Sequence, residues 1–149
     1  MNLKNDIDLA FKKAMQEKDK EGLSVLRMLK ASLKNKAIET KKQVLEDADI
    51  LTVLKSEIKK RRDSIESFLE NDRKEQAEKE KKELAVLQRF MPEQIGENEI
   101  IQTVEKVIKE LPEEEQGNFG KVMKAVMAKI GQKADGGLVA ATVKKLLSE

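Results

Sequence analysis

The 149-residue chain contains no cysteine and no histidine, and its only aromatic residues are four phenylalanines. The absence of cysteine excludes disulfides and thiolate chemistry, and the absence of both residues excludes the usual transition-metal sites, Ser-His triads and imidazole bases. Magnesium chemistry based on carboxylates alone stays open. The composition therefore predicts no catalytic residues, no cofactor and no resident metal.

Long apolar runs are also missing: the longest are a few residues, against the roughly 20 that a bilayer crossing needs. The segment from Met1 to Ala10 mixes Lys4, Asp6 and Asp8 with apolar residues, so it lacks the basic start and apolar run of a signal peptide. We expect a soluble, cytoplasmic protein with no membrane partner.

Hydrophobic residues make up 39% of the chain and charged residues another 39%, with Ala, Leu, Glu and Lys dominant. This composition is typical of packed amphipathic helices, and no stretch alternates as a strand would. The predicted fold class is all-α, with about four helices in N-terminal antiparallel hairpins followed by a small C-terminal three-helix bundle.

The first two helices are predicted from apolar residues at helical spacing. One arc of the first helix carries Leu3, Ile7, Ala10, Phe11, Ala14 and Met15. The second is predicted to begin after the N-cap Asp19 and to run to about Lys41, with inward positions at Leu23, Leu26, Leu33 and Ala37.

The third helix, capped by Asp47 or Asp49, is predicted to end near Glu70, and Asp72 with Glu75 resembles a capping box for a fourth. The apolar stripe of the third helix comprises Ile50, Leu51, Leu54, Ile58, Ile65, Phe68 and Leu69. The fourth carries inward Ala77, Leu84 and Leu87.

Two charged residues, Arg61 and Glu80, interrupt these apolar stripes. In an antiparallel hairpin that turns near Asn71, both would lie roughly 14 to 15 Å from the turn and face each other. We predict a buried or half-buried ion pair that sets the register of the hairpin and has a structural rather than a functional role. Removal of one partner would cost about 3 to 5 kcal/mol if burial is complete.

Pro92 and Gly96 interrupt the helical period and mark the predicted boundary between an N-terminal domain, residues 1–92, and a C-terminal domain, residues 96–149. The C-terminal domain is predicted to hold a fifth helix, a sixth capped by Asn118, and a seventh after a turn at residues 134–137. Inward positions are Ile100, Ile101, Val104, Val107, Ile108 and Leu111 on the fifth helix and Leu138, Val139, Val143, Leu146 and Leu147 on the seventh.

Between Gln116 and Leu147 the only charged residues are six lysines and Asp135. One face of the sixth helix is apolar, with Phe119, Val122, Met123, Val126, Met127 and Ile130, and the opposite face carries Lys121, Lys124 and Lys129. The lysines are either a solvated face or, with Lys133, Lys144 and Lys145, a patch that binds the phosphates of structured RNA. The run Glu113 to Glu115 could bind a divalent ion or simply be solvated.

Several separated segments resemble one known family. Gly120-Lys-Val-Met123, followed by Lys133-Ala-Asp-Gly136 and a closing amphipathic helix, resembles the GatB/YqeY motif, whose matching residues are Gly120, Val122, Met123, Ala134, Asp135 and Gly136. Arg27-Met-Leu, Lys60-Arg-Arg-Asp-Ser-Ile65, Glu80 with Glu83-Leu, and Phe90-Met-Pro-Glu-Gln94 extend the likeness. The chain thus resembles the small bacterial YqeY-like proteins over its full length. Gln132 departs from the glycine usual at its position, and Phe90-Met91-Pro92 departs from the usual Tyr-Leu-Pro.

The resemblance implies a function. The same motif forms the tail of the B subunit of the tRNA-dependent amidotransferase, where the tail contacts tRNA while catalysis occurs in other domains. It implies a non-catalytic module that binds tRNA or a tRNA-handling complex. From the charge pattern, we expect Lys121, Lys124, Lys133 and Lys144 to make most of the contacts. Two alternatives are an adapter that docks another protein and an accessory to a glutamine-dependent carbon-nitrogen ligase. The family's ligase label we interpret as inherited from the larger enzyme.

Overall fold

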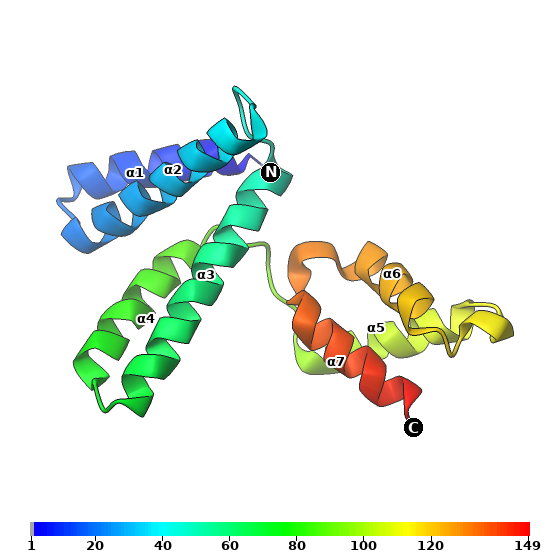
Figure 1. Ribbon diagram of the computed structural model, residues 1–149. Helices are drawn as coiled ribbons and strands as arrows, with labels where there is room; N and C mark the ends of the chain where they lie inside the picture. The colour runs from blue at the N-terminus through cyan, green and yellow to red at the C-terminus, as the bar shows by residue number, and fades with distance from the viewer. Residues whose placement is uncertain (1) are drawn as a thin grey trace. The chain divides into compact units, whose positions relative to one another are not determined.

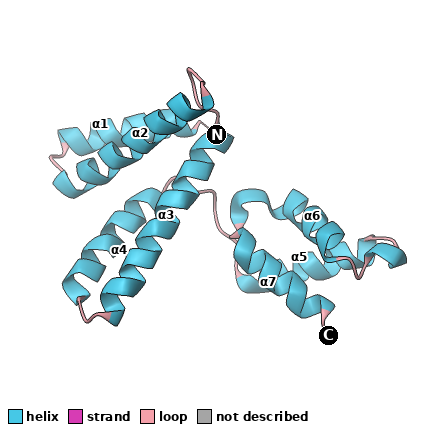
Figure 2. Ribbon diagram, in the orientation of Figure 1, coloured by secondary structure: helices cyan, strands magenta, loops and turns pink. Residues whose placement is uncertain are grey.

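The computed structural model describes residues 2–149, and every regular element in this part of the chain is a helix, which confirms the predicted all-α class (Figure 2). The α-helices are α1 (Leu3–Gln16), α2 (Lys20–Thr40), α3 (Asp47–Glu70), α4 (Lys74–Gln88), α5 (Glu97–Glu110), α6 (Phe119–Ile130) and α7 (Gly136–Leu147). Two short 3₁₀ helices are η1 (Glu113–Glu115) and η2 (Gly131–Lys133). Within residues 2–149, no helix has both the length and the apolar character that crossing a membrane requires.

The chain divides into two compact units, one that ends at Met91 and one from Pro92 to Glu149. In the first unit, α1 and α2 form one hairpin and α3 and α4 form another (Figure 1). Asp19 is the N-cap of α2, as predicted, and its carboxylate accepts a bond from the backbone N–H of Gly22. The core of this unit is formed by Leu3, Ile7, Ala14, Val25, Leu26, Leu29, Ile50, Leu51, Val53, Leu54, Ile58 and Leu87.

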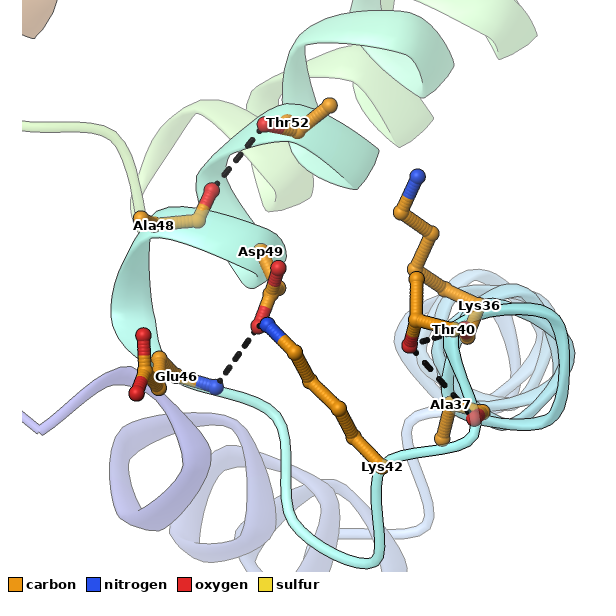
Figure 3. A network of polar contacts seen from close by, with 8 residues as sticks. All are labelled: Lys36, Ala37, Thr40, Lys42, Glu46, Ala48, Asp49 and Thr52. Atoms are coloured by element: carbon orange, nitrogen blue, oxygen red, sulfur yellow. Dashed lines mark hydrogen bonds and ion pairs between the residues drawn. The ribbon is translucent and has the colours of Figure 1, made fainter.

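The junction between α2 and α3 differs from the prediction at the cap. The N-cap of α3 is Glu46 rather than Asp47 or Asp49. Asp47 binds another helix, whereas Asp49, the third residue of α3, forms a capping box with Glu46. Asp47 accepts a bond of 3.0 Å from the backbone N–H of Leu3 and so caps α1 from a distant part of the sequence. Asp49 accepts a bond of 3.1 Å from the backbone N–H of Glu46, and Lys42 Nζ lies 2.8 Å from the same carboxylate (Figure 3).

Three helices of the first unit are followed, within two residues of their last residue, by a residue with left-handed backbone geometry, and none of the three is a glycine. Lys18, Lys41 and Asp72 have φ values of 55°, 56° and 55°. After Asp72, the backbone N–H of Arg73 donates a 2.7 Å bond to the carbonyl of Phe68, which closes α3 with the paired bonds of a Schellman motif. The predicted Asp72–Glu75 capping box is therefore wrong: Asp72 closes α3, and the N-cap of α4 is Arg73.

The second unit contains α5, α6 and α7 around a core formed by Ile100, Val104, Val107, Val122, Val126, Ile130, Ala134, Val139 and Val143. Asn118 caps α6, as predicted, by accepting a 3.0 Å bond from the backbone N–H of Lys121. The segment before α5 is fixed to η2, because the backbone N–H of Ile95 donates a 2.9 Å bond to the carbonyl of Lys133.

Four residues predicted on apolar faces are exposed instead. Met15 is 48% exposed, Leu69 47%, Leu138 44% and Phe119 37%. Each lies in the first or last turn of its helix, where few neighbouring turns are available to cover a side chain. The helical period predicted most of the buried stripes. It failed at these helix ends, and on α2 it left out Val25 and Leu29, which are buried.

Candidate nucleic-acid interface

The lysines of α6 are positioned by the burial of the opposite face. Val122 and Val126 are fully buried and Ile130 is 4% exposed, whereas Lys121, Lys124 and Lys129 are exposed. Met123 and Met127 are half-buried beside the valines. Burying this apolar stripe fixes the rotation of α6, so the structure holds three ammonium groups in solvent as the pattern predicted.

Two of these lysines are paired with carboxylates from the segment that precedes α6. Lys121 Nζ lies 2.8 Å from Glu115, and Lys129 Nζ lies 2.8 Å from Glu110. The hydrogen bond from Lys129 lowers the pKa of Glu110 below its ordinary value. The sequence reasoning missed these partners because it treated residues 116–147 separately from the acidic stretch before them. These two ammonium groups therefore already have a counterion within the protein.

The other four lysines are Lys124, Lys133, Lys144 and Lys145, all exposed and, in the part of the chain that the structure describes, outside ion-pair distance of any carboxylate. Lys144 Nζ lies 5.6 Å from the centroid of the Phe119 ring, within the range of a cation–π contact. Lys133 lies at the end of η2, where its carbonyl binds the Ile95 N–H. These four lysines are the ones most available to bind an external anion.

The residues of the sequence motif fall into two groups. Val122, Met123 and Ala134 pack in or against the core, and Asp135 caps α7 by accepting a 3.3 Å bond from the backbone N–H of Leu138. The glycines are not explained by packing. A Cβ atom on Gly120 would meet only the Asn118 side chain, at 3.4 Å, and one on Gly136 would meet nothing within 4 Å.

The first unit contains a second cluster of charged side chains. Arg61 is 7% exposed, and its Nη1 lies 3.1 Å from Oε2 of Glu80, so the structure brings these two side chains together across the α3–α4 hairpin. Nη1 also contacts the carboxylate of Glu83, and Nη2 lies 3.8 Å from the sulfur of Met28 on α2. The sequence reasoning missed Glu83, although its spacing of three residues from Glu80 places both on one face of α4.

The carboxylates that the structure describes do not form a candidate metal site. Among residues 2–149 no group of three or more His, Cys, Asp or Glu side chains is arranged to hold a metal ion. In the Glu113 to Glu115 run, which forms η1, Glu115 binds Lys121.

The fold and this surface together define a small all-helical protein whose C-terminal helical unit displays lysines. A family model described as "Yqey-like protein" matches residues 4–147, and the chain belongs to that family.

Curated relatives resemble the chain at moderate identity. A Pyrenophora tritici-repentis protein named "Altered inheritance of mitochondria protein 41, mitochondrial" is 34% identical over 126 residues, which cover 83% of this chain and 68% of the relative. The Vanderwaltozyma polyspora protein of the same name is 32% identical, with 87% and 68% covered. "Uncharacterized protein C22F3.15" of Schizosaccharomyces pombe is 36% identical over 80 residues, with 54% and 64% covered. The matches thus span about two thirds of each relative, and these eukaryotic proteins do not support the bacterial setting that the resemblance implied.

Proposed function

We propose that this protein is a non-catalytic binding module for structured RNA, tRNA above all, and that the exposed lysines of α6, η2 and α7 contact the RNA backbone. The observation that carries the proposal is the charge of one segment, residues 116–147, together with the exposure of its lysines. Six lysines and a single aspartate are the charged residues between Gln116 and Leu147, and the six lysines are exposed, while most of the large apolar side chains of this segment pack in or against the core.

Most of these lysines are available to an external phosphate, because within the described residues they are not paired with carboxylates of the protein. Four of the lysines have no carboxylate partner, so RNA binding would release counterions without first breaking an ion pair. RNA helices are recognised mainly by shape and backbone, a mode that needs few aromatic side chains. The similarity of residues 120–136 to the tail of the amidotransferase B subunit, whose tail contacts tRNA, supports the same class of ligand.

The test uses the unpaired lysines. In the intact chain, Lys124→Gln/Lys133→Gln should weaken binding to a tRNA transcript and reduce the slope of log K against log salt by about 1 to 2, because roughly 0.7 to 0.9 counterions are released per phosphate contact. Lys12→Gln/Lys34→Gln, which removes the same charge from exposed positions of α1 and α2, is the matched control and should leave both quantities nearly unchanged. Equal behaviour of the two double variants would reject this surface as the interface.

A protein adapter is the second candidate, and one observation favours it. A mostly apolar hollow between α3 and α4 is lined by Ile65, Leu69 and Leu84 and by the stems of charged residues, and Leu69 is 47% exposed. A partner helix is the occupant that such a groove fits. If the intact chain binds no RNA at low salt, the adapter function becomes the better interpretation.

Two finer points belong to the proposal. The role as accessory to a glutamine-dependent ligase would require turnover with glutamine, ATP and misacylated tRNA, and we expect none from the isolated chain. The relatives' names say that those proteins are mitochondrial, whereas the composition led us to expect the cytoplasm. The RNA-binding proposal applies in either compartment, because tRNA is present in both.

A further inference from the structure

One aromatic side chain of the C-terminal unit is exposed where the helical pattern predicts burial. Phe119 is 37% exposed, whereas Phe11, Phe68 and Phe90 are half-buried. It is the first residue of α6 and follows the cap Asn118. Most of the core of the unit comes from valines and isoleucines, so the core does not depend on this ring.

The surroundings of the ring suit a nucleotide. Lys144 Nζ lies 5.6 Å from the ring centroid, and Lys121 follows two residues later in the chain. Gly117 and Gly120 flank the position on both sides, and a Cβ atom on Gly117 would meet nothing within 4 Å. Glycine allows close approach of a ligand to the backbone, so a flat exposed ring lies here beside one ammonium group, that of Lys144, and between two positions without side chains.

We propose that Phe119 is the stacking platform for an unpaired base of the RNA, and that Lys144 holds the phosphate next to that base. This inference rests on the proposed function and adds to it the class of RNA, one with an unpaired nucleotide in a loop or at an end. Proteins that bind unpaired nucleotides combine aromatic rings with basic side chains in this way, since every base presents a π-face.

The first experiment uses tryptophan as a reporter, because the natural chain contains none. In the intact chain, Phe119→Trp keeps an aromatic ring at the platform, and its emission should be quenched by a hairpin RNA with a single-stranded loop. A blunt-ended duplex RNA of equal length should quench it far less. Leu9→Trp, at a position of α1 that is 65% exposed, is the control and should respond to neither RNA. Equal quenching of Phe119→Trp by both RNAs would overturn the proposal.

The second experiment measures affinity. Phe119→Leu keeps an apolar side chain but removes the π-face, and it should weaken binding to the looped hairpin by roughly tenfold, within the range of 5- to 150-fold that loss of one stacked base produces. The salt slope should stay at its wild-type value, since no charge is lost. A ring that served only to pack against Lys144 would lower thermal stability in this variant and leave the affinity for RNA unchanged, a result that contradicts the inference.

The outcomes separate this inference from the proposed function. If the wild-type chain binds neither RNA, both fall. If it binds RNA and Lys124→Gln/Lys133→Gln weakens binding while Phe119→Leu does not, the lysine surface stands and the stacking platform is wrong.

Discussion

The sharpest prediction concerns the buried guanidinium of Arg61. This side chain is 9% exposed and holds together two carboxylates, Glu80 at 25% and Glu83 at 13% side-chain exposure. Replacing Arg61 with Met keeps most of the apolar stem but leaves two negative charges facing each other in a partly buried site. Breaking a buried ion pair on one side costs about 3 to 5 kcal/mol. We expect about 3 kcal/mol for Arg61→Met, the lower end, because the more exposed Glu80 can turn partly into water.

The carboxylate variants should behave differently, because the cluster holds one more negative than positive charge. In Glu80→Gln, Arg61 keeps Glu83 as its counterion and can donate to the new amide oxygen, so the cost should be about 1 kcal/mol. Removing all three charges in Arg61→Met/Glu80→Gln/Glu83→Gln leaves no uncompensated charge, and this triple variant should recover most of the stability that Arg61→Met loses.

Urea unfolding followed by circular dichroism measures these differences. With a slope of about 1 to 3 kcal/mol per molar urea, a loss of 3 kcal/mol lowers the midpoint by roughly 1 to 3 M. Since the chain has two compact units, hydrogen exchange read by mass spectrometry assigns the loss. Amides of α3 and α4 should lose protection while those of α6 and α7 keep it. An Arg61→Met variant as stable as the natural protein, or one no worse than Glu80→Gln, would refute the reasoning.

Two further predictions concern the α2–α3 junction. Lys41 has a φ of 56°, a left-handed conformation that costs an L-residue about 1 to 2 kcal/mol, whereas the extra conformational entropy that glycine loses on folding costs about 0.5 to 1 kcal/mol. Lys41→Gly should therefore raise the free energy of unfolding measured in urea by about 0.5 to 1 kcal/mol. The control Lys34→Gly, inside α2, should lower it by about 1 kcal/mol. The hydrogen bond from Lys42 holds the pKa of Asp49 below its ordinary value of 3.8, so the pair's contribution is present at neutral pH and disappears as pH falls through that lowered pKa. Asp49→Asn should accordingly be less stable than the natural protein at pH 7, and the gap should narrow on acidification; a gap that is unchanged at low pH would contradict this account.

Much of the fold could be predicted because the helix centres obey a simple rule. Stripes such as Ile100, Val104 and Val107 on α5 repeat every three or four residues, and burial follows the repeat. Caps were predicted correctly where one side chain bonds its own helix, as Asp19 and Asn118 do. Asp135 caps α7 in the same way, although it was not predicted as a cap from the sequence. The prediction failed where a side chain serves a distant element. Asp47 could have capped α3 by local rules, but it binds the N–H of Leu3, 44 residues away in sequence.

The candidate site was predictable to a similar extent and for similar reasons. The periodicity of α6 put Lys121, Lys124 and Lys129 in solvent, because that choice depends only on which face is apolar. Which lysines carry a carboxylate partner depends on how α5 and η1 lie against α6, and the spacing of residues holds no information on that. Phe119 shows that local spacing alone cannot predict tertiary packing. Its position on the apolar face of α6 predicts burial, but in the packed structure the side chain, in the first turn of α6, stays exposed.

The order of charges along the chain explains why the basic surface is divided. The acidic stretch from Glu97 to Glu115 comes just before α6, so the lysines that reach back to it, Lys121 and Lys129, are partly neutralised within the protein itself. The lysines that follow or face away, Lys124, Lys133, Lys144 and Lys145, keep their full charge for an external anion. A solvated face that served only to keep the protein in solution would gain nothing from this separation, because interspersed opposite charges serve that purpose equally well. The proposed RNA-binding function accounts for it better, since ammonium groups without an internal counterion attract phosphate most strongly.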